Sequence, residues 1–172
     1  IIYQGVILSK KTKSFGCADL IVRSDYLNQL VKEKVISDED AKKPSPKLGH
    51  KNFHYRIIDV KFSKLHFNVD GKTLRNTANI KPFKCQIWIY NDGLGEMQGY
   101  LPPTAYILGN GWVLHKTVDK KKVKIHNKNP FNKLGQLDFN NNDSCYEEIA
   151  KKAIKWVRAV VNSENWSHDP IY

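Results

Sequence analysis

Cysteine is scarce in this sequence of 172 residues: Cys17, Cys85 and Cys145 are the only three, and they lie far apart. An odd number without paired spacing excludes a disulfide scaffold and a CxxC-type zinc site built from these residues alone. The sequence also has no apolar run near the ~20 residues of a membrane helix, no secretory signal and no GxxxxGK phosphate loop. These absences predict an intracellular protein with reduced thiols, no membrane contact and no ATP hydrolysis.

Acidic residues are few relative to basic ones, since 28 Lys+Arg against 17 Asp+Glu give a formal net charge of +11. Such a surface attracts polyanions, although a lysine coat that only keeps a protein in solution has the same composition. A hydrophobic fraction of 41% argues against intrinsic disorder and is enough for one domain over residues 1–172. Because residue 1 already belongs to an apparent strand and 165–170 resembles a linker, we expect this domain to be a segment of a longer protein.

The hydrophobic pattern predicts alternating strands and helices. Strands are expected at 4–8, 15–23, 55–62, 106–108, 112–115 and 123–125. Helices are expected at 26–35, 81–97 and about 144–161, the last with an inward stripe of Ile149, Ala153, Trp156 and Val160. A turn is expected at 109–111, and the polar stretch 37–52 is interpreted as an insertion or mobile loop. This order predicts an α/β (α+β) domain with a central mixed β-sheet flanked by helices.

Two of the expected strands carry charged residues among apolar ones. Asp59 and Lys61 flank Val60 in one strand, and Asp19 lies in the other. Buried charges must pair, line a cleft or bind an ion, because leaving them unpaired is costly. If the strands are neighbours, Asp19, Asp59 and the Val60 carbonyl form an oxygen site suited to Mg²⁺ or Mn²⁺. Lys61 could then orient a water and stabilise the transition state of phosphodiester hydrolysis; the alternative is a buried salt bridge between Lys61 and one Asp.

A third polar element is expected on the helix at 81–97. Gln86 and Tyr90 are four residues apart and therefore share a face. Gln86 is the lone polar side chain in an apolar run, and a buried amide needs hydrogen-bond partners. A substrate phosphate or the metal site could supply those partners, and a core glutamine satisfied by the protein itself is the alternative.

Three short motifs follow one another in the order of a known family. They are GCAD at 16–19, which resembles GhhD, DVK at 59–61, which resembles DhK, and QIWIY at 86–90, which resembles QhxxY. Together they resemble the signature of RecB-like nucleases in the PD-(D/E)xK superfamily. The segments 97–102 and 106–111 are similar to nuclease domains of that family joined to superfamily 1 helicases. The resemblance covers about residues 2–156, except for 28–53.

The resemblance implies a restriction-endonuclease-like fold and metal-dependent cleavage of single- or double-stranded DNA, in repair, recombination or replication. It implies Asp19 and Asp59 as ligands of Mg²⁺ or Mn²⁺, Lys61 as the catalytic lysine, and Gln86 and Tyr90 as residues that support the site or bind substrate. It also implies a helicase domain in the same chain as a partner. Family members usually add an acidic residue or a His from a helix before the first strand, which here would precede residue 1.

Two alternatives to a DNA nuclease stay open. One is a non-catalytic, basic nucleic-acid-binding module on a degenerate nuclease fold, and the other is an RNA-processing nuclease with the same site. Lysines crowd a hairpin-like stretch opposed only by Asp119; they are Lys116, Lys120, Lys121, Lys122, Lys124 and Lys128. They are predicted to bind phosphates without regard to sequence, or to form a solvated loop. Among the six histidines, each expected to be structural or exposed, His66 is closest to Lys61 in the sequence.

Overall fold

The computed structural model describes residues 1–77 and 80–163, which form one six-stranded mixed sheet flanked by helices. The strands are β1 (Ile2–Ser9), β2 (Ser14–Arg23), β3 (Tyr55–Phe67), β4 (Thr104–Val118), β5 (Lys121–Asn127) and β6 (Gly135–Asp138). Their order in the sheet is β1-β2-β3-β4-β5, and β6 pairs with β4. The β3–β4 pair is parallel and the other pairs are antiparallel. The expected α/β (α+β) class is thus confirmed.

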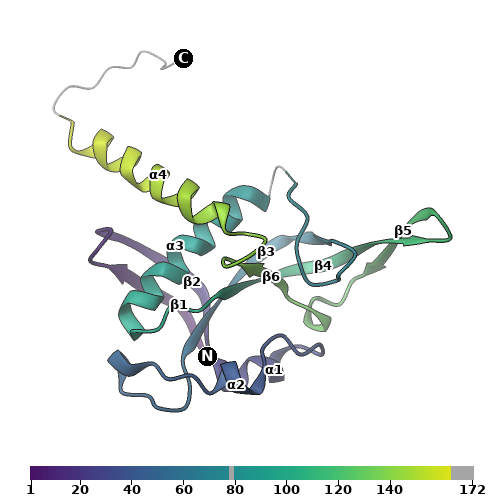
Figure 1. The fold of residues 1–172 in the computed structure, drawn as a ribbon, viewed down its shortest axis with the longest axis horizontal. Helices are drawn as coiled ribbons and strands as arrows, with labels where there is room; N and C mark the ends of the chain where they lie inside the picture. Colours follow the sequence, from purple (N-terminus) through teal and green to yellow (C-terminus); the bar gives the residue numbers. More distant parts are fainter. Residues whose placement is uncertain (78–79, 164–172) are drawn as a thin grey trace.

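Helices cover both faces of the sheet and divide the core in two (Figure 1). On one face, α3 (Ile80–Gln98) and α4 (Cys145–Val161) contribute Ile87, Trp88 and Ala150 to the larger cluster. On the other, α1 (Leu27–Leu30) and α2 (Asp38–Ala41) pack beneath β2, β3 and β4. Within the described residues, no helix combines the length and hydropathy required to cross a bilayer.

The turn predicted at 109–111 is wrong, because β4 runs without a break from Thr104 to Val118. The irregularity lies instead in β3, whose register against β4 shifts between Lys61 and Lys64. At Gly109 a Cβ atom would lie 2.6 Å from the Ser63 carbonyl oxygen. The glycine is therefore needed for the close approach of a bulged neighbouring strand, and not for a change of chain direction.

The final helix forms, but its predicted inward stripe is wrong. Ile149 and Trp156 are 49% and 61% exposed, and the buried residues of α4 are Tyr146 and Ala150, in its first turns. Farther along, α4 lies over the narrow β1–β2 turn, where Arg158 donates a hydrogen bond to the Thr12 carbonyl. A turn offers little apolar surface, so the second half of the helix keeps its apolar side chains in solvent. The linker expected at 165–170 lies outside the described residues.

Two further elements differ from expectation. The helix predicted at 26–35 is a short helical segment, a 3-10 turn at Ser24–Tyr26 followed by α1. It ends early because the Asn28 side chain accepts hydrogen bonds from the Val35 and Ile36 amides and so folds the chain back. Strand β6 was not expected, because its four residues are too few to show a period.

The segment 37–52, interpreted above as an insertion or mobile loop, contains α2 and a 3-10 turn at Pro46–Leu48. It is tied to the sheet by Asp40, which pairs with the fully buried guanidinium of Arg56 on β3. Arg56 also donates to the Thr104 carbonyl at 2.9 Å and to His54 Nε2 at 2.7 Å. The buried guanidinium therefore has hydrogen-bond or ion-pair partners from three parts of the chain: α2, the residue before β3, and the start of β4.

The buried His54 predicts a loss of stability in acid. Its Nε2 accepts a hydrogen bond from Arg56, and its Nδ1 lies 3.0 Å from the Lys43 carbonyl. The neutral ring with its proton on Nδ1 satisfies both contacts, whereas a second proton on Nε2 would face the Arg56 donor. Burial, and then the Arg56 charge, lower the pKa of His54 to about 4. In the unfolded chain, where the His pKa is ~6.5, this ring takes up a proton at a higher pH than it does in the native state. Its contribution to the free energy of unfolding is therefore fully present above about pH 6.5 and is lost as the pH falls toward 4.

We expect the free energy of unfolding to drop by roughly 2–3 kcal/mol between neutral pH and about pH 4.5 from this residue. Urea titrations at several pH values measure this drop in the wild type and in His54→Gln. The amide oxygen of the glutamine can still accept a hydrogen bond from Arg56. The variant should show a shallower pH dependence. Parallel pH profiles for the two proteins would contradict the assignment.

Candidate active site

Strands β2 and β3 separate next to Asp19. Their backbone ladder ends with the Leu20–Ile58 pair. One step farther, Asp19 Oδ2 accepts a 2.7 Å hydrogen bond from the Val60 amide, where a carbonyl of the partner strand would otherwise bind. A charge-assisted bond of this kind is stronger than a neutral one. The carboxylate of β2 is therefore fixed at the point where the two strands part.

The other oxygen of Asp19 is bound by Gln4, a residue that the sequence did not single out. Gln4 Nε2 donates to Asp19 Oδ1 at 3.3 Å, and its Oε1 accepts a hydrogen bond from the Cys17 thiol at 3.4 Å. Gln4 stands opposite Asp19 between two paired positions of β1 and β2, and its φ is +52°. A non-glycine residue in this region is strained, and such strain is common beside functional sites.

Asp59 is almost completely buried beside Asp19. Its Oδ2 forms an ion pair with Lys61 Nζ at 2.7 Å, and no other donor in residues 1–77 and 80–163 bonds to this oxygen. Burial raises the pKa of Asp59, Lys61 opposes the rise, and the Asp19 carboxylate within hydrogen-bond reach adds to it. Two carboxylates this close repel each other unless a proton or a cation lies between them.

A chain of side chains leads from Asp59 to helix α3. Lys61 Nζ donates to Gln86 Oε1 at 3.1 Å, and Gln86 Nε2 donates to the Tyr90 hydroxyl at 2.9 Å. The Lys61 ammonium also lies 4.5 Å from the centre of the Phe83 ring, a cation–π contact. These contacts hold the ammonium in one place, and the half-buried amide of Gln86 has protein partners at both ends.

Tyr90 also packs against β2, at the first residue of the GCAD motif. A Cβ atom at Gly16 would lie 2.2 Å from the Tyr90 ring. Only glycine lets the tyrosine ring approach the strand this closely, three residues before Asp19. Helix α3 and strand β2 are therefore in direct contact beside the carboxylates.

The structure brings the predicted site residues together. Asp19, Asp59, Lys61, Gln86 and Tyr90 form one connected set on the α3 side of the sheet. Val60 joins them through its amide, and the role predicted for its carbonyl stays a prediction. Gln4 and Phe83 are the additional members. No local signal marks Gln4, because its position opposite Asp19 depends on the register of β1.

Asp19 and Asp59 are the residues that could hold a divalent cation. Two adjacent carboxylates, one with a buried oxygen whose sole partner among the described residues is the Lys61 ammonium, are hard oxygen ligands of the kind Mg²⁺ and Mn²⁺ prefer. Within the described part of the chain no three His, Cys, Asp or Glu side chains gather around one point. A cation here would take its remaining ligands from water or substrate, which is typical of Mg²⁺.

The predicted phosphate-binding lysines lie elsewhere. Lys116, on β4, and Lys120, Lys121, Lys122 and Lys124, on the turn and β5, are exposed along the antiparallel β4–β5 hairpin, which projects from the sheet (Figure 1). The hairpin expected from the sequence is present, and Asp119 and Lys120 turn the chain with positive φ angles of 49° and 62°. Whether it binds nucleic acid stays a prediction.

Comparison of the chain with family models of known proteins gives no match, and neither does comparison with curated proteins. The resemblance to RecB-like nucleases therefore depends on the three short sequence motifs.

Proposed function

We propose that this protein is a metal-dependent nuclease that hydrolyses DNA phosphodiester bonds with Mg²⁺ or Mn²⁺. The observation that carries the proposal is the meeting of Asp19 and Asp59 beside the Lys61 ammonium, at the point where β2 and β3 separate. Such a nuclease would act inside the cell in DNA repair, recombination or replication, in a chain that can include a helicase domain.

The residues of the site have distinct tasks in this reaction. The Val60 amide and Gln4 orient Asp19, while burial and Lys61 fix Asp59. Asp19 and Asp59 would hold the cation, which would supply Lewis acidity to activate a water and to neutralise charge on the phosphate. Lys61, positioned by Gln86, donates a hydrogen bond to the phosphate oxygen on which negative charge develops.

A specific observation supports one alternative. Lys61 forms an ion pair with Asp59 at 2.7 Å, so protein groups alone satisfy part of the buried charge. A degenerate nuclease fold that binds nucleic acid without cutting it would keep such a pair and the net charge of +11. The proposal and this alternative differ in whether a divalent cation enters the site.

Removal of the metal tests the proposal. We expect the protein to cut labelled single- or double-stranded DNA with Mg²⁺ or Mn²⁺, to stop in EDTA, and to recover when excess Mn²⁺ is added. Anomalous scattering from a crystal soaked in Mn²⁺ should place one ion between Asp19 and Asp59. Parallel reactions with RNA of the same sequence separate the two kinds of nuclease. Binding without cleavage in either metal, and no ion at the two carboxylates, would favour the non-catalytic module.

A further inference from the structure

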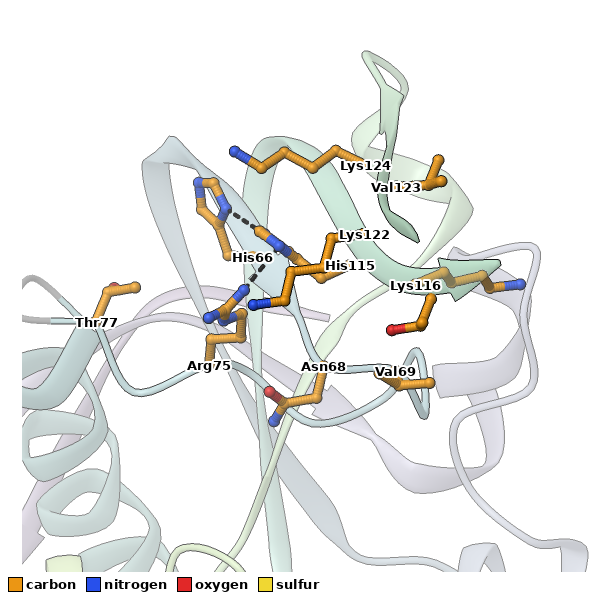
Figure 2. Close-up of a pocket in the computed structure, with 11 residues that line it drawn as sticks. His66, Asn68, Val69, Arg75, Thr77, His115, Lys116, Lys122, Val123 and Lys124 are labelled. Carbon is orange, nitrogen blue, oxygen red and sulfur yellow. Dashed lines mark hydrogen bonds between the residues drawn. The ribbon is translucent and has the colours of Figure 1, made fainter. Parts of the chain in front are cut away.

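A second polar region lies beyond Lys61, in a cleft of about 630 Å³ between the end of β3, the segment after it and the β4–β5 hairpin (Figure 2). Its basic lining residues are His66, Arg75, His115, Lys116, Lys122 and Lys124. The described residues that line it include no Asp or Glu. A concave surface with charge of one sign concentrates the electrostatic field and attracts counter-ions.

The two histidines of this cleft are held in one arrangement by Arg75. Arg75 Nη1 lies 2.7 Å from His115 Nδ1, and His115 Nε2 lies 3.2 Å from His66 Nδ1 (Figure 2). A guanidinium can only donate, so His115 Nδ1 accepts and its Nε2 carries the proton that is donated to His66. The remaining nitrogen of His66, Nε2, then carries a proton and is a donor.

This hydrogen-bond chain favours an anion over a metal ion as the ligand. Nδ1 of His115 and Nδ1 of His66 are already used as acceptors, while the groups at the open side are donors: His66 Nε2, Lys122 and Lys124. Burial and then the Arg75 charge lower the pKa of both His66 and His115. The second of these effects, repulsion by Arg75, is expected where several cations share a cleft without a counter-charge.

The cleft approaches the candidate active site through a neighbouring cavity. A second cavity, of about 450 Å³, shares His66, Arg75 and Thr77 with the first and is also lined by Phe83. Phe83 is the ring beneath the Lys61 ammonium. The two adjacent cavities, called the groove below, therefore extend from Phe83, beside Lys61, to the β4–β5 hairpin, and their lining adds Lys64.

We infer that this groove binds the phosphate groups of the nucleic-acid strand that extends from the Asp19–Asp59 site, with Arg75, His66 and Lys124 as its anchors. The inference rests on the proposed function, and it assigns the path of the substrate. His66 follows Lys61 by five residues, but because of the bulge in β3 the two residues lie opposite Gly109 and Val113 of β4, four residues apart, or roughly 13 Å at ~3.3 Å per residue of strand. At ~3.4 Å per nucleotide of a stacked strand, about four nucleotides span this distance.

The test measures binding without cleavage. A fluorescein-labelled dT12 oligonucleotide is titrated with protein in EDTA, and anisotropy gives the affinity at several salt concentrations. We expect Arg75→Gln/Lys124→Gln to bind at least about tenfold more weakly and to lower the salt slope by roughly 1.4, the value for two contacts to a single strand. The control, Lys10→Gln/Lys11→Gln, removes the same charge from the β1–β2 turn at the opposite edge of the sheet and should bind like the wild type.

The other outcomes contradict the inference. Equal losses in the two double variants would mean that only net charge matters, and no loss in either would mean that the strand avoids the groove. Competition by inorganic phosphate as effective as that by dT12 would indicate a pocket for single anions. Thermal melting of all variants checks the fold. Because cleavage plays no part here, the groove and the nuclease activity can fail independently of each other.

Discussion

Asp59→Asn should reduce DNA cleavage by about 10³-fold or more, which is the size of loss produced when a main electrostatic stabiliser is removed from an active site. The substitution keeps the shape of the side chain and removes its charge, so the site loses one of its two carboxylates. The adjacent ammonium of Lys61 keeps its bond to Gln86. Gel analysis of labelled DNA in Mn²⁺ measures the rate, and anisotropy in EDTA should show little change in DNA affinity.

Asp25→Asn is the matched control for this experiment. Asp25 pairs with Arg23 at the exposed end of β2, so the same charge is lost away from the site. It should cleave DNA like the wild type. If Asp59→Asn cleaves DNA at the wild-type rate, the carboxylate pair is not the catalytic centre. If it also loses DNA binding and its melting transition, the defect is one of folding, and Asp19→Asn then becomes the test.

Lys84→Met should destabilise the protein by about 3–5 kcal/mol, the typical result of removing one partner from a buried ion pair. Lys84 on α3 is 1% exposed and pairs with Asp143 just before α4. Its ammonium also donates to Asn76 Oδ1 at 2.9 Å and to the Leu74 carbonyl at 3.3 Å. Methionine replaces the aliphatic stem and leaves the Asp143 carboxylate buried without its cation. Urea unfolding measures the change.

Lys81→Met, at an exposed position of the same helix, should change stability by no more than about 0.5 kcal/mol. The double variant Lys84→Met/Asp143→Leu should recover much of the loss, because no unpaired charge remains. A loss in Lys84→Met no larger than that in Lys81→Met would show that the buried pair contributes nothing to stability.

The main features of the site could be predicted because they depend on local contrast. Asp19, Asp59 and Lys61 are charged residues in apolar strands, and Gln86 is an amide in an apolar helix. A charged residue among apolar ones does not, however, show whether its role is in a functional site or in holding the fold together. Arg56 and Lys84 are also buried charges, but their partners lie in the α2 segment and before α4, where they link elements of the fold.

Features that depend on long-range pairing could not be predicted. The Gly109–Gly111 stretch has the composition of a turn, but a bulge in β3 keeps it extended within β4. The apolar side of α4 was expected in the core, and yet Trp156 is exposed because the helix extends over a hairpin turn. Gln4 reaches Asp19 through the register of β1. None of these three features can be recognised from the few residues around it in the sequence.

The close contact between Gly16 and the Tyr90 ring makes that ring a spacer between helix and sheet. A side chain at position 16 would overlap the Tyr90 ring, so the ring or the strand that bears Asp19 would have to move. Under the proposed function, selection at position 16 would therefore act on the placement of Asp19, through a residue that is not itself a ligand. Under the proposed function, variation at this glycine in related sequences would therefore mark proteins that no longer cleave DNA.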